Sequence, residues 1–343
     1  MPLVTKGKEN VTVPSLIVVG ARKSGTASLF RMLGQHPDVA SIVPEVYVRG
    51  SMGFMAQDPA TYPMEAEWAG DRLETELPAE IVGNVLSEYS RPYILAESRE
   101  EGNDNKILTT ELSPAYLASP LAPYRLKGAM PDVKVVLLLR DPVDRYFSEL
   151  RDKLCVYDES RIDWDDIASS FAGVSASKSY LSEAVLDYSP YDKVCLGEGA
   201  SPSDLWRCKE GAERSHRPLL EGLYAVQIAR WLRVFDASQV KIVDSKKLFS
   251  EPEKTAADVA KFAGLSEHTF FEFGVDRESS CDPRRRSQKV SVAYYKRKEA
   301  EPNFRKWYAD HNDMLAELIG QDFGWNDRIR SGNADPHSGF LRG

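Results

Sequence analysis

The sequence predicts an α/β fold with a central parallel sheet flanked by helices, and two stretches of the chain indicate it most clearly. Leu16–Val19 is a short apolar run rich in β-branched residues, which is typical of a buried strand. It leads through a glycine-bounded turn into a helical pattern that starts at Thr26. Val133–Leu139 is almost entirely apolar, as expected for a strand covered on both faces in the middle of a parallel sheet. Alternating strands and helices are the building units of this fold class.

The remaining elements follow along the chain in the alternation that a parallel sheet requires. Further strands are expected at Ile107–Leu112 and Lys241–Asp244. Asp141 and Pro142 suit an N-cap and a first helical residue, so a helix is expected after them. Amphipathic helices are expected over Leu220–Phe235, Pro252–Phe262 and Phe304–Leu318.

The length and composition are those of a globular protein with its own core. The chain has 343 residues, of which 42% are apolar and 28% charged. We expect one domain over residues 14–325, in which the irregular stretch 158–215 is a lid or an acceptor-side insertion. Residues 1–13 and 326–343 are expected to be flexible tails.

The charge balance and hydropathy exclude some classes of partner. The formal net charge is −8, from 44 Lys and Arg against 52 Asp and Glu, which argues against nucleic acid as the main partner. No stretch approaches the ~20 apolar residues of a membrane span, and the N-terminal residues contain no apolar signal core. The chain as written is therefore expected to be soluble and cytoplasmic.

The four cysteines show no C-x-x-C spacing, so no zinc site is predicted. Cys195 and Cys208 bracket a stretch rich in Gly, Ser and Pro. A disulfide between them would stabilise the chain by about 3 kcal/mol in an oxidising compartment. Four reduced cysteines are the equally open alternative.

The turn between Gly20 and Gly25 is a candidate anion site. It has the G-x-x-x-x-G spacing of a Walker A loop, but Thr26 stands where Walker A has its lysine, and Lys23 lies inside the turn. Backbone N–H groups and the helix dipole at such a helix start favour negative charge. An internal lysine suits the bridging oxygen of a phosphate-linked leaving group better than a β,γ-phosphate with magnesium. An ordinary strand–turn–helix with a surface lysine is the alternative.

Arg140 marks a second candidate anion site. It ends the predicted central strand, and open α/β sheets bind ligands at the carboxyl ends of their strands. Ser148 lies two turns into the helix that follows, and an arginine with a nearby hydroxyl can bind an anion. Arg140 could instead cap the helix or pair with Asp144.

Charged residues outside these two sites have two interpretations each. Glu45 is close in sequence to the turn and could take a proton from an attacking hydroxyl, or it could be a solvated loop residue. Arg284, Arg285, Arg286 and Lys289 put four cations within six residues. They form either a solvated loop or a clamp on a nucleotide.

These motifs together resemble sulfotransferases of the carbohydrate (glycosaminoglycan) type, which use 3′-phosphoadenosine 5′-phosphosulfate (PAPS). The resemblance lies in four blocks that span most of residues 14–325: 20–39, 110–116, 139–148 and 223–236. The fourth block, with the arginine-rich stretch after it, is most similar to N-acetylgalactosamine 4-sulfate 6-O-sulfotransferase. It is less similar to heparan sulfate 3-O-sulfotransferase.

The resemblance implies a role for each matching residue. The loop that holds the 5′-phosphosulfate would consist of Arg22, Lys23, Ser24, Gly25, Thr26, Ala27 and Ser28. Lys23 would also stabilise the leaving phosphate, and Glu45 aligns with the catalytic base of the family. Arg140 and Ser148 would bind the 3′-phosphate, and the loop around Arg284–Arg286 would close over the nucleotide. The family's chemistry uses no metal and releases PAP, adenosine 3′,5′-bisphosphate.

The sequence also departs from this family. Leu112 stands where the heparan enzymes have a lysine, and Tyr47 stands where they often have a histidine. The expected acceptor is a carbohydrate hydroxyl, and the alternatives are O- or N-sulfation of a small metabolite, a nucleotide kinase and a non-catalytic nucleotide-binding module. The kinase would need a lysine directly after Gly25. A Golgi location is expected if the chain is the catalytic domain of a longer protein.

Overall fold

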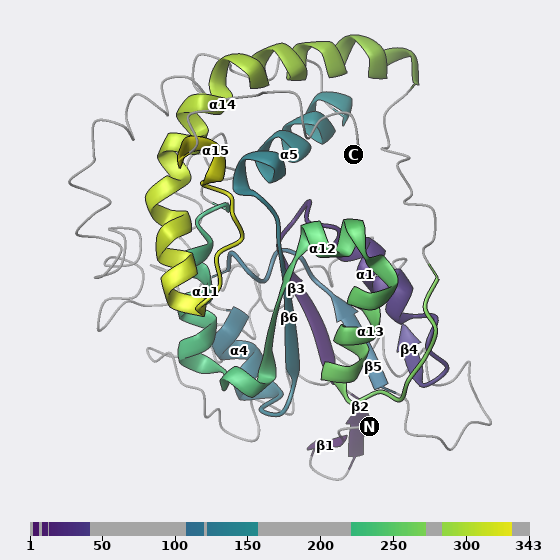
Figure 1. The fold of residues 1–343 in the computed structure, drawn as a ribbon. Helices are drawn as coiled ribbons and strands as arrows, with labels where there is room; N and C mark the ends of the chain where they lie inside the picture. The colour runs from purple at the N-terminus through teal and green to yellow at the C-terminus, as the bar shows by residue number, and fades with distance from the viewer. Residues whose placement is uncertain are drawn as a thin grey trace, which may run out of the picture. The chain divides into compact units, whose positions relative to one another are not determined.

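The structure is a computed structural model, which describes residues 3–6, 9–12, 14–41, 108–119, 122–156, 221–271 and 283–330. Its centre is a five-stranded sheet, and a separate antiparallel pair is formed by β1 (Leu3–Lys6) and β2 (Glu9–Thr12) (Figure 1). The strands of the sheet are β3 (Leu16–Gly20), β4 (Val39–Ser41), β5 (Leu108–Leu112), β6 (Lys134–Leu139) and β7 (Val240–Asp244). The predicted α/β fold with a central parallel sheet is confirmed.

The order of the strands places a ligand-binding edge beside β3. The order is β4-β5-β3-β6-β7, and each neighbouring pair is parallel. The chain passes from β3 to β4 on one side and later crosses to β6 on the other side of β3. Such a reversal is a topological switch point, and open α/β sheets bind ligands outside the carboxyl ends of the strands there. The turn that follows Gly20 lies at that end of β3.

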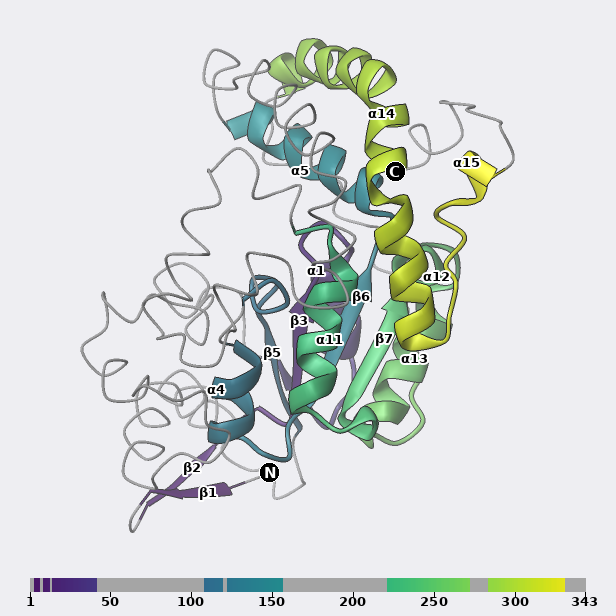
Figure 2. The same cartoon turned by 90° about the vertical axis from the view of Figure 1, so that its left-hand side faces the viewer.

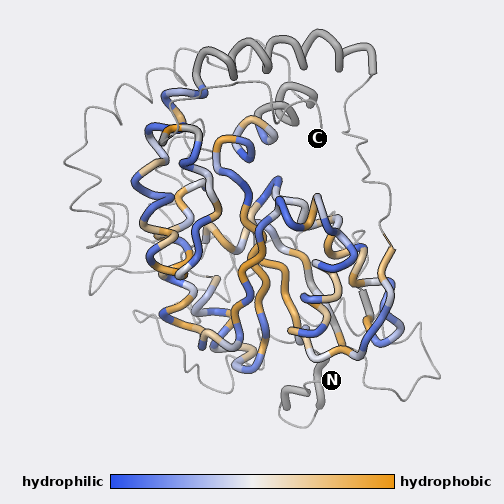
Figure 3. Tube along the Cα trace, viewed as in Figure 1, coloured by the Kyte–Doolittle hydropathy of each residue, from blue (hydrophilic) through white to orange (hydrophobic). Residues whose placement is uncertain are grey.

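Helices cover both faces of the sheet. On one face lie α1 (Thr26–Leu33), α12 (Ser245–Ser250) and α13 (Pro252–Ala263) (Figure 1). On the other lie α4 (Ala122–Ala129) and the carboxyl-terminal part of α11 (Tyr224–Val234) (Figure 2). The strands between them are the most continuously apolar part of the described chain (Figure 3), and every residue of β3 is buried. This is the pattern of a strand covered on both faces.

The apolar residues of each strand alternate between two cores. One core joins the sheet to α1, α12 and α13 through residues that include Val18, Leu138 and Phe30. On the opposite face, the indole Nε1 of Trp231 donates to the carbonyl oxygen of Leu117 at 3.3 Å, and no part of the Trp231 side chain is exposed. The two cores fix the position of β3 and hence of the turn at its end.

The described residues fall into two compact units. We call the sheet with its covering helices the sheet unit. The helical unit contains α5 (Pro142–Val156), the first residues of α11, α14 (Pro283–Ile319) and α15 (Asp327–Arg330). Within it, the ring centroid of Phe304 on α14 lies 4.6 Å from that of Tyr146 and 5.3 Å from that of Phe147, both on α5. One domain over 14–325 stays a prediction.

The expected helix at Phe304–Leu318 is much longer in the structure. α14 begins at Pro283, so Arg284, Arg285 and Arg286 form its first turn, and the expectation that they lie in a loop was wrong. Proline suits a first helical position because its φ is fixed and its missing N–H is not needed there. Arginine is also a good helix former. Pro302 lies inside α14, which changes direction along its length in Figure 1.

Candidate functional site

The turn after β3 is held by main-chain bonds. The Ala21 N–H donates to the carbonyl oxygen of Leu138 at 2.6 Å, which ties the turn to β6. The Ser24 N–H donates to the Ala21 carbonyl oxygen at 3.3 Å. Lys23 (φ 64°) and Gly25 (φ 88°) both adopt left-handed backbone conformations. The turn therefore reverses within a few residues and delivers the chain to the start of α1 at Thr26.

The two glycines of this turn are favoured for different reasons, close packing at Gly20 and a left-handed backbone at Gly25. A Cβ at Gly20 would lie 2.5 Å from Cβ of Leu117, which is closer than two non-bonded carbon atoms can approach. A Cβ at Gly25 would lie 3.0 Å from Cδ2 of Leu248 and 3.1 Å from the ring of Phe249. The glycine spacing that the sequence shows thus reflects the packing of Leu117 against Gly20 and the φ of 88° at Gly25.

The N-terminus of α1 is open to an anion. No side chain of the described residues caps it, and its first turn contains no acidic residue. The first hydrogen bond of the helix ladder runs from the Leu29 N–H to the Gly25 carbonyl oxygen at 3.1 Å. The N–H groups of residues 26–28 come before the first of these bonds and have no carbonyl partner within the helix. The helix dipole adds partial positive charge at the same end. A phosphate or sulfonate group can accept hydrogen bonds at such a helix end.

Ser24 supplies a further donor inside the turn. Its side chain is completely buried, and its Oγ has no hydrogen-bond partner among the residues that the structure describes. Its carbonyl oxygen accepts a 2.7 Å hydrogen bond from the Ser245 hydroxyl. A buried hydroxyl without a partner is costly, and a phosphate oxygen would satisfy it. The turn therefore fits an anionic group at this place.

All seven residues predicted to hold the 5′-phosphosulfate lie in this one junction, which we call the anion loop (residues 20–28). The Arg22 side chain is exposed, and the Lys23 side chain is half-buried. Thr26 is buried at the start of α1, where Ala27 is exposed and Ser28 half-buried. The loop thus combines two cations, a buried hydroxyl and a helix N-terminus within nine successive residues.

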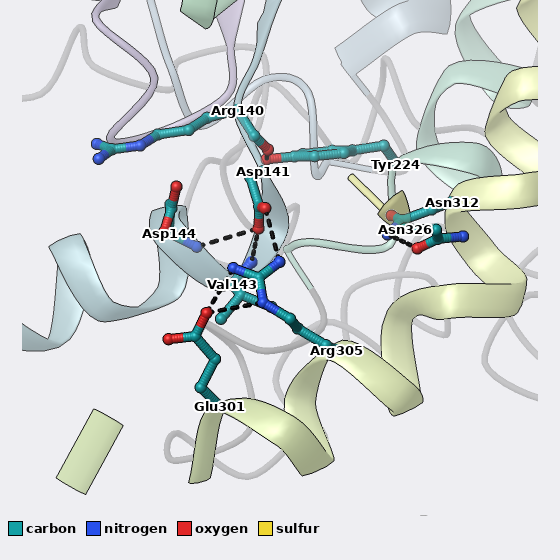
Figure 4. A network of polar contacts seen from close by, with 9 residues as sticks. All are labelled: Arg140, Asp141, Val143, Asp144, Tyr224, Glu301, Arg305, Asn312 and Asn326. Carbon is teal, nitrogen blue, oxygen red and sulfur yellow. Dashed lines mark hydrogen bonds and ion pairs between the residues drawn. The ribbon is translucent and has the colours of Figure 1, made fainter. Parts of the chain in front are cut away.

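The second predicted anion site begins directly after β6, and we call residues Arg140–Pro142 the Arg140 corner. Oδ1 of Asp141 accepts hydrogen bonds from the N–H groups of Val143 (2.9 Å) and Asp144 (3.3 Å), so Asp141 is the predicted N-cap of α5. The Tyr224 hydroxyl donates to the carbonyl oxygen of Arg140 at 3.0 Å. Figure 4 shows the Arg140 side chain extending away from these contacts.

An ion pair that the sequence did not predict completes the Arg140 corner. The Arg305 guanidinium donates to Oδ2 of Asp141 at 2.9 Å, and its Nε donates to Oε1 of Glu301 at 2.7 Å. Burial and the neighbouring Asp144 raise the pKa of the Asp141 carboxyl above its ordinary value, against the opposing charge of Arg305. Burial disfavours the charge of Arg305, but Asp141 and Glu301 raise its pKa above the ordinary value. The two carboxylates therefore stabilise the charged form of the Arg305 guanidinium.

A second buried arginine lies on α5. The Arg145 side chain is fully buried and contacts the carboxylates of Glu149 (2.8 Å) and Glu221 (3.5 Å). The spacing of Arg145 and Glu149 by four residues was a visible signal of this pair in the sequence. Glu221 offered no such signal, because it is far away along the chain. Ser148, predicted as a ligand of the 3′-phosphate, is buried on the same helix.

Several predicted features lie outside the described residues. They are Glu45, Tyr47, the insertion at 158–215, and the cysteines Cys195 and Cys208. For Arg284, Arg285 and Arg286 the structure gives the helical backbone and no side-chain positions. In the described ranges, no helix is both long and apolar enough to cross a membrane. Over the same ranges, no three His, Cys, Asp or Glu side chains gather as metal ligands would.

The chain is similar to known proteins over most of its length. The family described as "Sulfotransferase domain" matches residues 14–310. A mouse bifunctional heparan sulfate N-deacetylase/N-sulfotransferase 4 is 25% identical over 318 residues, which are 90% of this chain and 30% of that protein. A mouse heparan sulfate glucosamine 3-O-sulfotransferase 6 is 22% identical over 342 residues, which are 94% of this chain and 77% of that protein.

A solved structure has the same fold. It is a sulfotransferase from Alicyclobacillus acidocaldarius with a TM-score of 0.50 and 22% sequence identity, which covers 92% of this chain and 99% of that one. This chain spans only about three-tenths of the length of the bifunctional relatives. The family match covers most of the chain and includes both the anion loop and the Arg140 corner. The chain belongs to the sulfotransferase family.

Proposed function

We propose that this chain transfers the sulfonate group of PAPS to a hydroxyl group of a carbohydrate. The observation that supports this most strongly is the anion loop, with a lysine inside it, at an uncapped helix N-terminus on the switch-point edge of the sheet. The family match and the printed names of the heparan sulfate relatives support the sulfonate and the carbohydrate. When bound, PAPS supplies a sulfur that an acceptor oxygen attacks in line with the bridging oxygen of the phosphosulfate.

Several groups of the anion loop have a role in this reaction. Lys23 donates to the bridging oxygen, on which negative charge grows as the S–O bond breaks. The N–H groups at the start of α1 and the Ser24 hydroxyl hold the 5′-phosphate, and Arg22 balances its charge. Because these groups are fixed by the fold before the reaction, they need no reorganisation while the charge develops. The leaving group is PAP.

A base must accept the proton of the attacking hydroxyl as the new O–S bond forms. We assign this role to Glu45, because it matches the base position of the family and follows the anion loop closely in the sequence. A glutamate with an ordinary pKa is ionised at neutral pH and can accept the proton. The proton therefore leaves the acceptor oxygen for Glu45 while the sulfonate leaves the phosphate for the same oxygen.

The second anion site would hold the 3′-phosphate of the nucleotide. Arg140 presents a guanidinium at the end of β6, and Ser148 presents a hydroxyl on α5. A guanidinium can bind a phosphate through two parallel hydrogen bonds. Arg284, Arg285 and Arg286, in the first turn of α14, would add positive charge over the bound nucleotide.

The names of the bifunctional relatives favour a second candidate acceptor, which is an amine on a sugar. They contain the term N-sulfotransferase, and the chain resembles them over 74% to 92% of its length. An amine nitrogen would attack the sulfur in the same in-line geometry, the bond from sulfur to the bridging oxygen would break, and the base would remove a proton from that nitrogen.

The proposed function is tested by incubating the purified chain with PAPS and a panel of acceptors. The panel contains heparan and chondroitin chains, their N-deacetylated forms, and small hydroxylated or amino metabolites. Mass spectrometry should show the gain of one sulfonate group on a polysaccharide hydroxyl. Gain on nitrogen alone supports the amine, and gain on metabolites alone contradicts the carbohydrate. A phosphorylated product from ATP, or no transfer to any acceptor, contradicts a sulfotransferase.

A further inference from the structure

The peptide group that joins Ser24 to Gly25 in the anion loop lies between two that main-chain bonds hold. The peptide group before it is held by the Ser24 N–H, which donates to the Ala21 carbonyl oxygen at 3.3 Å. The one after it is held by the Gly25 carbonyl oxygen, which accepts the Leu29 N–H at 3.1 Å. Among the main-chain hydrogen bonds between described residues, none uses the Gly25 N–H or the Ser24 carbonyl oxygen. The orientation of this peptide group therefore depends on another contact.

That contact comes from a side chain on α12. The Ser245 hydroxyl donates to the Ser24 carbonyl oxygen at 2.7 Å, and the bond is buried. Ser245 is only 1% exposed, so water does not compete for the carbonyl oxygen. Ser245 is 221 residues further along the chain, but α12 lies beside the start of α1 (Figure 1). The hydroxyl therefore ties the start of α12 to one peptide group of the anion loop.

Gly25 by itself would allow this peptide group to flip. Because a peptide group is planar, it flips through opposite rotations about ψ of the residue before it and φ of the residue after it. Glycine adopts positive and negative φ about equally readily, so it does not resist such a flip as other residues do. Gly25 has a φ of 88° in the structure. The Ser245 hydroxyl thus selects one of two orientations that a glycine leaves open.

The selected orientation decides where the Gly25 N–H points. The bond between Ser24 and Gly25 is trans, and the C=O and N–H bonds of a trans peptide group point in opposite directions. Because the carbonyl oxygen points to Ser245, the N–H points away from α12. Gly25 is only half-buried, and it directly precedes residues 26–28, whose N–H groups have no carbonyl partner within the helix. The Gly25 N–H can therefore add one donor to this set.

We infer that Ser245 is a positioning residue for the 5′-phosphate, because its hydroxyl fixes the peptide group so that the Gly25 N–H donates to a phosphate oxygen. This inference rests on the proposed function, in which the anion loop holds the 5′-phosphosulfate. A donor that is oriented before the ligand arrives costs no ordering on binding. Without the hydroxyl, the peptide group is free to flip and to present its carbonyl oxygen, which repels a phosphate.

The first test compares the dissociation constants of PAP and of adenosine 3′-monophosphate, which lacks the 5′-phosphate, by calorimetry. Ser245→Ala should weaken PAP binding about tenfold, as expected for the loss of one hydrogen bond to a charged group. It should leave the binding of the monophosphate nearly unchanged, because that ligand has no group to place on the anion loop. If Ser245 only stabilised the fold, the ratio of the two constants would not change.

Two control variants separate this effect from a general loss of stability. Ser250→Ala removes a hydroxyl from the exposed end of α12 and should bind both ligands as the wild type does. Val259→Ala removes buried methyl groups of α13 from the core of the sheet unit. It should lower the melting temperature and leave the ratio of the two dissociation constants unchanged. Equal changes of the ratio in Val259→Ala and Ser245→Ala would overturn the inference.

A second measurement needs no variant and uses the amide signals of the isotope-labelled wild-type chain in NMR spectra. A hydrogen bond from an amide to a phosphate oxygen moves the signal of the amide proton downfield. PAP should move the Gly25 signal in this way, and adenosine 3′-monophosphate should not. The signal of Gly264, at the end of α13, is the internal reference and should stay in place with both ligands.

The outcomes separate the inference from the proposed function. A wild-type chain that binds PAP no better than adenosine 3′-monophosphate contradicts the placing of the 5′-phosphate on the anion loop, and the inference with it. A wild-type preference for PAP that Ser245→Ala retains overturns the inference alone. So does a Gly25 amide signal that bound PAP leaves in place.

Discussion

The anion loop and the Arg140 corner both follow the carboxyl end of a strand and both carry a cation, but they are built differently. The anion loop is held by main-chain bonds and by close packing around Gly20 and Gly25. The Arg140 corner is held by side chains from far along the chain, those of Tyr224 and Arg305. The glycines and cations of the loop are visible in a short stretch of sequence, whereas the distant side chains that hold the corner are not.

The difference implies that the loop is the more sensitive of the two to a change in its own residues. Lys23→Ala should reduce turnover about thousandfold, because it removes the cation that meets charge developing in the transition state. The measurement is the steady-state rate with saturating PAPS and acceptor. Lys261→Ala, which removes an exposed lysine from α13, is the control and should keep the wild-type rate. A Lys23→Ala enzyme within tenfold of wild type would remove Lys23 from the chemistry.

The packing of the loop can be broken without touching its charge. Gly20→Ala should lower the free energy of unfolding by about 3 kcal/mol, because the new Cβ would lie 2.5 Å from Cβ of Leu117 and 3.2 Å from the Pro114 carbonyl oxygen, so the surrounding chain must shift. Gly264→Ala is the control. Gly264 also has a positive φ (92°), but a Cβ there meets no atom within 4 Å, so only the smaller backbone cost applies. Equal losses in the two variants, measured by denaturant unfolding, would show that packing does not constrain Gly20.

Acid should act on the helical unit through a buried histidine. Burial lowers the pKa of His311 on α14 to about 4, against the opposing effect of Asp310. In the unfolded chain His311 has its ordinary pKa of 6.5, so between pH 6.5 and about 4 it is protonated there but neutral in the folded chain. The free energy of unfolding therefore falls as the pH drops through this range. The loss amounts to at most about 3 kcal/mol. His311→Gln should flatten the dependence of the unfolding free energy on pH over this range, and an unchanged slope would contradict the assignment.

Arg140→Ala should separate nucleotide binding from chemistry. We expect the KM for PAPS to rise about thirtyfold, while kcat changes much less, because the 3′-phosphate is remote from the reacting sulfur. Steady-state kinetics at varied PAPS concentration measures both constants. A fall in kcat with an unchanged KM would place Arg140 at the reacting centre instead.

The smallest effect on stability is expected from removing the hydrogen bond between Ser245 and the anion loop. Ser245→Ala removes the hydroxyl that donates to the Ser24 carbonyl oxygen and should cost about 1 kcal/mol of stability. Ser250→Ala, at the exposed end of the same helix, is the control and should cost less, because the hydrogen bond from the Ser250 hydroxyl to the Lys247 carbonyl oxygen is long (3.5 Å) and exposed to solvent. A variant at Ser245 with wild-type stability would show that the main chain alone holds the loop.

The contrast between the two regions also explains which elements and contacts could be predicted from the sequence and which could not. The β3 run, the glycine spacing and the cap formed by Asp141 and Pro142 are local patterns, and the structure confirms the elements that they predicted. Arg305 was missed because its partner Asp141 is 164 residues away along the chain. The arginine-rich stretch was expected to be a loop because charge runs are usually solvated, but proline at the first position and good helix formers after it extend α14 to Pro283.

A crystal structure of the chain with PAP bound tests the assignment of the anion loop most directly. We expect the 5′-phosphate to contact Nζ of Lys23 and the N–H groups at the start of α1, and the 3′-phosphate to contact the Arg140 guanidinium. The Ser24 hydroxyl should then have its missing partner. A nucleotide bound elsewhere, with Lys23 turned into bulk solvent, would contradict the central claim that the loop after β3 is the site of the phosphosulfate.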